Sequence, residues 1–353
     1  MTHVFVSPHP DDIALSCGGL VASLRELGQK VTILTVFSGT GASSGMSEYQ
    51  RAALGIGTKV NHPNTEAFRR GNIGADYSVS ADPADNPPWL ADEDRLEVTQ
   101  ERANTQARQF WQRAAWTRSA NITNAESDAR PLADSIGGQG SLERIDFDAA
   151  DAAAMRRLEE ERYAYFSEAS VIFLDLPDAV YRGYEGDAEL LSSPRDDDLA
   201  PLDLLRSEIV RLEPQMVYFP LAIGGHVDHQ LCRDVGVSLL GEGRRWVMPG
   251  PGFVGRVSFY EDFPYAWWGE GSARDDAAAL DLPVGVNVEA QYSDISDLLA
   301  RKAAGIRVYA SQLPRLFESD QTMLDDLYGY HAKVALSGGV SGYAERYWAT
   351  VKP

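Results

Sequence analysis

The chain has only two cysteines among its 353 residues, Cys17 and Cys232. Two thiols are too few for a disulfide framework or for a zinc site built from thiolates. The sequence also lacks any run of about 18 apolar residues, which a membrane-spanning helix needs. A basic stretch followed by an apolar segment, the mark of a secretory signal, is missing too. We therefore expect a cytoplasmic protein whose cysteines are small buried residues.

Basic residues are scarce relative to acidic ones, with 32 lysines and arginines against 52 aspartates and glutamates and a formal net charge of -20. Binding to nucleic acid or to an anionic membrane requires a basic patch, and none is visible, so neither partner is expected. The glycines of "SCGGLVAS" lack the G-x-G-x-x-G spacing, and no G-K-[ST] follows. Nucleotide binding is therefore disfavoured.

Short apolar, β-branched runs recur along the chain and alternate with segments of helical periodicity. Strands are predicted at His3–Pro8, Lys30–Gly39, Ala169–Asp178, Gln215–Ala222, Gly255–Tyr265 and Leu282–Glu289. Helices are predicted at about 294–311 and 320–335. Strands that alternate with helices indicate a Rossmann-like, doubly wound, mostly parallel α/β sheet.

Residues from about 43 to 148 break this alternation. They begin with stretches rich in glycine, asparagine, serine, aspartate and proline, and then show one amphipathic helical pattern. We find no linker and no internal repeat, and we interpret 1–353 as a single domain with a long insertion after the second strand. That strand is predicted to end at the carboxyl edge of the sheet, so the insertion is expected to be a lid or a subunit interface.

Candidate ligands follow the first predicted strand directly, in "VFVSPHPDDIALSCGG". His9, Asp11 and Asp12 lie where the strand has ended and the next helix has not yet begun, and this carboxyl edge is where open parallel sheets bind ligands. An aspartate here could instead simply cap the helix. By itself, this motif supports a cap and a metal ligand equally.

Prolines and glycines frame the same motif. Pro8 and Pro10 cannot donate to a sheet ladder, so they are expected to end the strand and to hold the turn. Gly18 and Gly19 are expected to let the backbone pass close to a bound ligand.

A second polar motif, "GGHVDHQ", lies just beyond another predicted strand and contains His226, Asp228 and His229. If both motifs occupy one edge of the sheet, His9, Asp12 and one histidine of this pair form a catalytic zinc set with an open position. Two nitrogens and one carboxylate suit zinc better than magnesium. Zinc would lower the pKa of bound water to about 7 and polarise a carbonyl group.

The groups left over from such a set are also reactive. Adjacent residues point in different directions, so Asp11 and Asp12 should not both bind one ion, and one of them can act as a base. The remaining histidine could meet an oxyanion or protonate a leaving group, and a nearby aspartate would keep it cationic.

The two motifs, in this order and each after a strand, resemble the signature of the PIG-L or LmbE-like family of zinc-dependent N-deacetylases. The resemblance implies a three-layer sandwich fold and a zinc ion, or another divalent metal, bound by His9, Asp12 and His229. It also implies Asp11 as general base and His226 as electrophilic or acid partner, with Asp228 behind it.

Weaker similarity continues in "RLEEERYA" and "FLDLPD", where the resemblance implies that Arg157 and Asp178 approach the sugar. "YEDFPY" and "RKAAGIRVYASQ" are also similar to the family, although packing or salt bridging explains them equally well. Trp267 and Trp268 follow "YEDFPY" and could offer aromatic faces to a sugar, but tryptophans more often anchor a core or an interface.

The expected function is removal of an acetyl group from an N-acetylated amino sugar or glycoside, of the N-acetylglucosamine type, by a possible homo-oligomer. One alternative keeps the metal but cleaves another small amide or a thiol-sugar conjugate. Another is a non-catalytic carbohydrate-binding protein on the same scaffold. The presence of both the ligands and the base in the sequence disfavours the last interpretation.

Overall fold

The computed structural model describes residues 1–40, 149–198, 202–241, 255–269 and 273–351. The proposed insertion, residues 43–148, lies outside them, so its role as a lid or an interface stays a prediction. None of the described helices is long and apolar enough to span a membrane. Cys17 and Cys232 are both buried and unpaired, as expected.

The described strands form one seven-stranded sheet with the order β3-β2-β1-β4-β5-β7-β6. The first five strands in this order are mutually parallel, while β7 runs antiparallel to both β5 and β6. The bounds are β1 (Thr2–Ser7), β2 (Lys30–Thr35), β3 (Ser170–Phe173), β4 (Met216–Pro220), β5 (Arg256–Tyr260), β6 (Asn287–Asp294) and β7 (Ala344–Val351). The predicted mostly parallel α/β sheet is confirmed.

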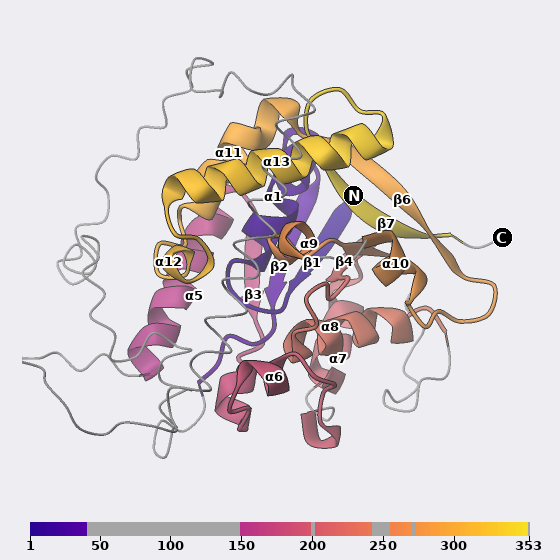
Figure 1. The fold of residues 1–353 in the computed structure, drawn as a ribbon. Coiled ribbons are helices and arrows are strands. Elements are labelled where there is room, and N and C mark those ends of the chain that lie inside the picture. The colour runs from indigo at the N-terminus through magenta and orange to yellow at the C-terminus, as the bar shows by residue number, and fades with distance from the viewer. Residues whose placement is uncertain (41–148, 199–201, 242–254, 270–272, 352–353) are drawn as a thin grey trace, which may run out of the picture.

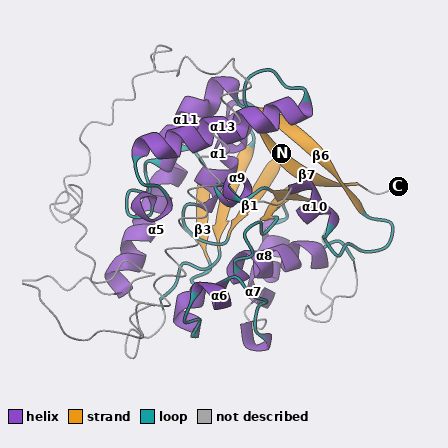
Figure 2. Ribbon diagram, in the orientation of Figure 1, coloured by secondary structure: helices purple, strands orange, loops and turns teal. Residues whose placement is uncertain are grey.

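Helices cover both faces of this sheet, which gives the three-layer arrangement seen in Figures 1 and 2. One apolar core packs α1, α11 and α13 on the sheet, and a second packs α7 and α8 on it. The helix bounds are α1 (Asp12–Glu26), α5 (Ala149–Phe166), α6 (Asp187–Leu190), α7 (Leu202–Leu212), α8 (Val227–Ser238), α9 (Tyr265–Trp268), α10 (Ala273–Ala278), α11 (Leu299–Ile306), α12 (Leu313–Leu316) and α13 (Asp320–Gly338). Short 3₁₀ turns are η2 (Ala179–Arg182), η3 (Asp196–Asp198) and η4 (Ser296–Leu298).

The C-terminal part differs most from the sequence prediction. The strand expected at Leu282–Glu289 lies at Asn287–Asp294, and the strand β7 was not anticipated. The helix expected from 294 therefore begins later, after the 3₁₀ turn η4, and ends at Ile306. The helix expected at 320–335 is present as α13.

Gly18 and Gly19 do not lie against a ligand position, as was expected, but pack against other parts of the fold. Both lie inside α1 and face other secondary structure elements rather than a ligand position. A Cβ atom on Gly19 would lie 2.5 Å from Ile295 Cγ2, and one on Gly18 would lie 3.1 Å from Lys302 Cγ. These glycines therefore allow close packing of α1 against α11 and its preceding turn.

Trp267 and Trp268 are core anchors. Their side chains are buried, and their indole N–H groups donate to the two carboxylate oxygens of Asp326 on α13, at 3.1 and 2.8 Å. A platform for sugar binding requires an exposed aromatic face, so the packing interpretation holds for this pair.

Candidate metal centre and active site

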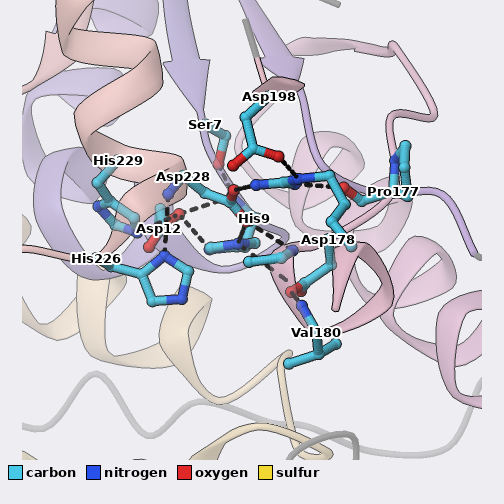
Figure 3. Close-up of polar contacts among 12 residues, drawn as sticks. Ser7, His9, Asp12, Pro177, Asp178, Val180, Asp198, His226, Asp228 and His229 are labelled. Carbon is cyan, nitrogen blue, oxygen red and sulfur yellow. Dashed lines mark hydrogen bonds and ion pairs between the residues drawn. The ribbon is translucent and has the colours of Figure 1, made fainter. Parts of the chain in front are cut away.

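The polar residues of the two sequence motifs meet at the carboxyl edge of the sheet. The first motif lies between β1 and α1, and the second lies between β4 and α8; these two strands are neighbours. The loops that follow β3 and β5 reach the same edge. Together they gather a buried or half-buried cluster, most of which is drawn in Figure 3: His9, Asp12, Asp178, His226, Asp228, His229 and Asp262.

The three residues expected to bind the metal lie around one carboxylate oxygen. Asp12 Oδ2 is 3.6 Å from His9 Nδ1 and 3.4 Å from His229 Nε2. The same oxygen accepts the backbone N–H of His9 at 2.7 Å, which fixes the carboxylate in the turn. His226 is close as well, because ring nitrogens of His9, His226 and His229 all lie within 4.8 Å of one another.

Two further carboxylates bind the ring nitrogens of His9 and His229 that face away from Asp12. His9 Nε2 is 2.9 Å from Asp228 Oδ2, and His229 Nδ1 is 2.7 Å from Asp262 Oδ1. Each imidazole therefore turns its other nitrogen toward Asp12. Histidine ligands of metals characteristically donate their second N–H to a carboxylate in this way, so the donor set fits a divalent cation.

The charges at the site also fit a cation. Burial by itself would raise the pKa of Asp12, but the charge of His229 and the hydrogen bonds from His9 lower it to about 2. Burial would lower the pKa of His9, yet Asp178, Asp12 and Asp228 raise it to about 10. The excess of carboxylates thus keeps a proton on His9, and metal binding would displace that proton.

Asp11 is a candidate for proton transfer. It is the residue before α1, yet its side chain makes no capping hydrogen bond, which argues against the simple cap. The side chain is buried, and burial together with the charge of Asp12 raises its pKa well above the usual range. A nearby cation would lower this pKa again. Such an environment suits a group that takes up and releases a proton.

His226 is neutral rather than cationic. Burial, followed by the charge of His9, lowers its pKa to about 4. Its Nδ1 accepts the backbone N–H of Asp228 at 3.2 Å, so the proton of the neutral ring lies on Nε2. His226 can therefore donate a hydrogen bond to an oxyanion without carrying a charge.

Asp228 does not lie behind His226 as the resemblance implied. Its fully buried carboxylate accepts from His9 Nε2, from Arg182 Nη2 at 2.5 Å and from the backbone N–H of Ala179 at 3.1 Å. Asp228 therefore orients the predicted ligand His9 and ties it to the turn η2.

The arginine at the site is Arg156, not the expected Arg157. Arg157 is 41% exposed, pairs with Asp175 at 2.5 Å and stacks on the ring of Phe173. Arg156 instead lies 3.3 Å from Asp178 Oδ2, which is in turn 3.7 Å from His9 Nε2. One residue along a helix changes the direction of a side chain by about 100°. Asp178 thus lies in the cluster, and its contact with a sugar stays a prediction.

A small surface hollow opens beside this pair. Its lining includes Pro10 of the first motif, Phe37 and Gly39 after β2, and Arg156 and Asp178.

Asp262 was not assigned a role from the sequence, although it belongs to the noted "YEDFPY" segment. We expect Asp262→Asn to weaken binding of a divalent cation by about 10- to 100-fold, because the amide supports the His229 ring less well. Chelator-competition titration measures this effect. Asp326→Asn, a buried aspartate that accepts the indole N–H groups of Trp267 and Trp268, is the control. Equal affinity in the two variants would contradict the role of Asp262.

The fold and the site together define a class of protein. It is an α/β protein in which histidine and aspartate side chains suited to metal binding lie at the carboxyl edge of a mostly parallel sheet. Residues 4–74 match the family model described as PIG-L: GlcNAc-PI de-N-acetylase. The resemblance predicted from the motifs is therefore confirmed. The second motif lies outside the matched residues.

Two curated relatives are both named 2'-N-acetylparomamine deacetylase. The one from Streptomyces fradiae is 35% identical over 161 residues, which cover 44% of this chain and 53% of that protein. The match thus spans about half the length of this relative. The one from Niallia circulans is 24% identical over an alignment that covers 98% of this chain and 89% of that protein.

Solved structures share the fold. A deacetylase from the biosynthesis pathway of teicoplanin is 20% identical, with a TM-score of 0.59 over 100% of this chain and 99% of that one. The A40926 pseudoaglycone deacetylase Dbv21 is 20% identical, with a TM-score of 0.53 over 99% of this chain and 97% of the other. The LmbE-like deacetylase fold expected from the sequence is confirmed.

Proposed function

We propose that this protein is a zinc-dependent hydrolase that removes the acetyl group from an N-acetylated amino sugar. The observation that carries the proposal is the placement of two carboxylate-supported histidines around Asp12, beside the buried carboxyl group of Asp11. The two curated relatives support an amino-sugar substrate related to 2'-N-acetylparomamine.

The residues that would hold the zinc ion are His9, Asp12 and His229, and the ion would supply Lewis acidity to the acetamide carbonyl. Asp11 takes a proton from the attacking water molecule and later gives it to the departing nitrogen. His226 donates its Nε2–H to the oxygen that becomes negative during the attack. The products are acetate and the free amine, so one water molecule is consumed for each amide bond.

The charge of the chain favours a substrate that bears ammonium groups. A net charge of -20 attracts cations to the protein surface and disfavours anionic substrates. Amino sugars with further free amines meet this condition. The cytoplasmic location, activity on N-acetylglucosamine derivatives and a homo-oligomeric state stay predictions.

The test is acetate release from 2'-N-acetylparomamine, from N-acetylglucosamine and its glycosides, and from simple N-acetyl amides. We expect release from at least one amino sugar, a loss of about 100-fold or more after chelation, and recovery when zinc is added back. Removal of the metal takes away the Lewis acid and leaves the protein residues in place. Release that survives complete chelation would contradict the metal-dependent mechanism. Release only from simple amides would favour the alternative amidase function.

A further inference from the structure

A buried carboxyl group lies beneath the turn that carries Asp11. Glu160, on α5, is 1% exposed. Its Oε2 accepts the backbone N–H of Asp11 at 3.3 Å and the hydroxyl of Tyr309 at 2.5 Å, while its Oε1 accepts the hydroxyl of Thr35 at 2.8 Å. Glu160 therefore joins the end of β2, the segment after α11 and the first motif. None of these three contacts is with a proposed metal ligand.

The backbone of Asp11 needs such support. Its φ of 106° lies in the region that side-chain-bearing residues rarely adopt. A conformation of this kind persists where the surrounding structure holds it, and it is typical of functional sites. The carbonyl of Asp11 accepts from Leu15 as in any helix, whereas the backbone N–H of Asp11 donates to the side chain of Glu160.

We propose that Glu160 is the positioning residue for Asp11: its carboxyl group holds the Asp11 N–H and thereby keeps the Asp11 side chain in the orientation for proton transfer. The inference rests on the proposed function, because it assigns the base role to Asp11. It adds a residue on a distant helix to the catalytic arrangement, with Tyr309 and Thr35 fixing the position of Glu160 itself.

The protonation of Glu160 is compatible with this role. Burial raises the pKa of Glu160 to about 7, although the hydrogen bonds from Tyr309 and Thr35 oppose the rise. In either state the side chain offers an oxygen acceptor to the Asp11 N–H. A glutamine at this position would keep that acceptor, whereas an apolar side chain would remove it.

The chain supplies a matched control in the next residue. Glu159 is also buried, at 5% exposure, and burial raises its pKa to about 7 as well. Its oxygens accept from the backbone N–H and the hydroxyl of Ser311, at 2.8 and 2.6 Å. Glu159 and Glu160 thus share a helix and are both buried carboxyl groups, but the described hydrogen bonds of Glu159 go to Ser311 and not to the first motif.

The experiment compares kcat, KM and bound metal for Glu160→Met, Glu160→Gln and Glu159→Met in the metal-loaded protein. A misplacement of about 1 Å can cost about 100-fold in rate. We therefore expect Glu160→Met to lower kcat by about 10- to 100-fold with unchanged metal content and a KM close to that of the wild type. Glu160→Gln should restore kcat to within about fivefold of the wild type, since it keeps the acceptor. Glu159→Met should keep the wild-type kcat.

Three results would overturn the inference. The first is that Glu160→Met keeps the wild-type kcat, and the second is that Glu159→Met loses as much kcat as Glu160→Met. The third is that Glu160→Gln has a kcat as low as that of Glu160→Met. If Glu160→Met does not fold, Tyr309→Phe takes its place. That variant removes one donor that holds Glu160, and it should lower kcat by a smaller factor; an unchanged kcat would then refute the proposal.

A crystal structure separates this inference from the proposed function. The φ of Asp11 should become negative in Glu160→Met, or in its substitute Tyr309→Phe. In Glu160→Gln it should remain positive. If the wild-type protein releases no acetate, the proposed function fails, but the φ of Asp11 in these variants still decides whether Glu160 holds the turn.

Discussion

Asp11→Asn is expected to lower kcat for acetate release by about 10²- to 10⁴-fold, the usual contribution of a general base. Asparagine preserves the size of the side chain but cannot accept a proton from water. The oxygen that faces His9 and His229 belongs to Asp12 and not to Asp11, so the metal content should not change. Steady-state kinetics and elemental analysis of the same sample measure both quantities.

Two further variants serve as controls for activity and metal content. Asp12→Asn removes charge from the oxygen that faces both His9 and His229, so we expect it to lose the metal together with the activity. Asp175→Asn changes an exposed carboxylate that pairs with Arg157, so it should change neither. Full activity in Asp11→Asn would remove the proposed base and, with it, the mechanism.

The core of the site could be predicted from the sequence because it depends on a general property of parallel sheets. The carboxyl ends of neighbouring parallel strands lie side by side, so motifs that directly follow β1 and β4 must meet. This property predicts His9, Asp12 and one histidine of the second motif at the same edge, and the choice of His229 over His226 came from the family resemblance. The α/β class follows in the same way from the alternation of strands and helices.

The residues that support this core could not be predicted because their positions depend on the tertiary structure. Arg156 and Arg157 fit the same sequence pattern, and only the packing of α5 decides which of them faces the site. The partner of Asp228 depends on η2, a turn that follows a different strand. Asp262 follows β5 and makes its contact through the loop geometry. The antiparallel strand β7 also escaped prediction.

The segment after β3 illustrates how a distant loop completes the site. Arg182 donates to Asp228, to Asp198 at 2.7 Å and to the carbonyl of Pro177 at 2.6 Å. These three partners are labelled in Figure 3. Asp228 is fully buried, and a buried carboxylate requires partners that compensate for its lost hydration. Arg182 therefore makes it possible for Asp228 to stay charged while it holds His9.

A second buried ion pair stabilises the layer behind the site. Lys302 on α11 lies 2.6 Å from Glu345 on β7, and their side chains are 0% and 4% exposed. Glu345 also accepts the backbone N–H groups of Gly19 and Leu20, at 2.8 and 2.6 Å. The close approach that the two glycines of α1 allow thus brings the helix backbone onto this carboxylate.

Lys302→Met is expected to lower the free energy of unfolding by about 3–5 kcal/mol, because it leaves the buried carboxylate of Glu345 without its cation. The double variant Lys302→Met/Glu345→Gln should recover much of this loss, since the amide carries no charge and its oxygen can still accept from the α1 backbone. Urea unfolding of the metal-free proteins measures both. Arg307→Met removes a cation from the more exposed pair with Asp320 and should cost only about 0.2–1 kcal/mol. A Lys302→Met variant no less stable than Arg307→Met would show that the buried pair contributes no more than a surface pair does.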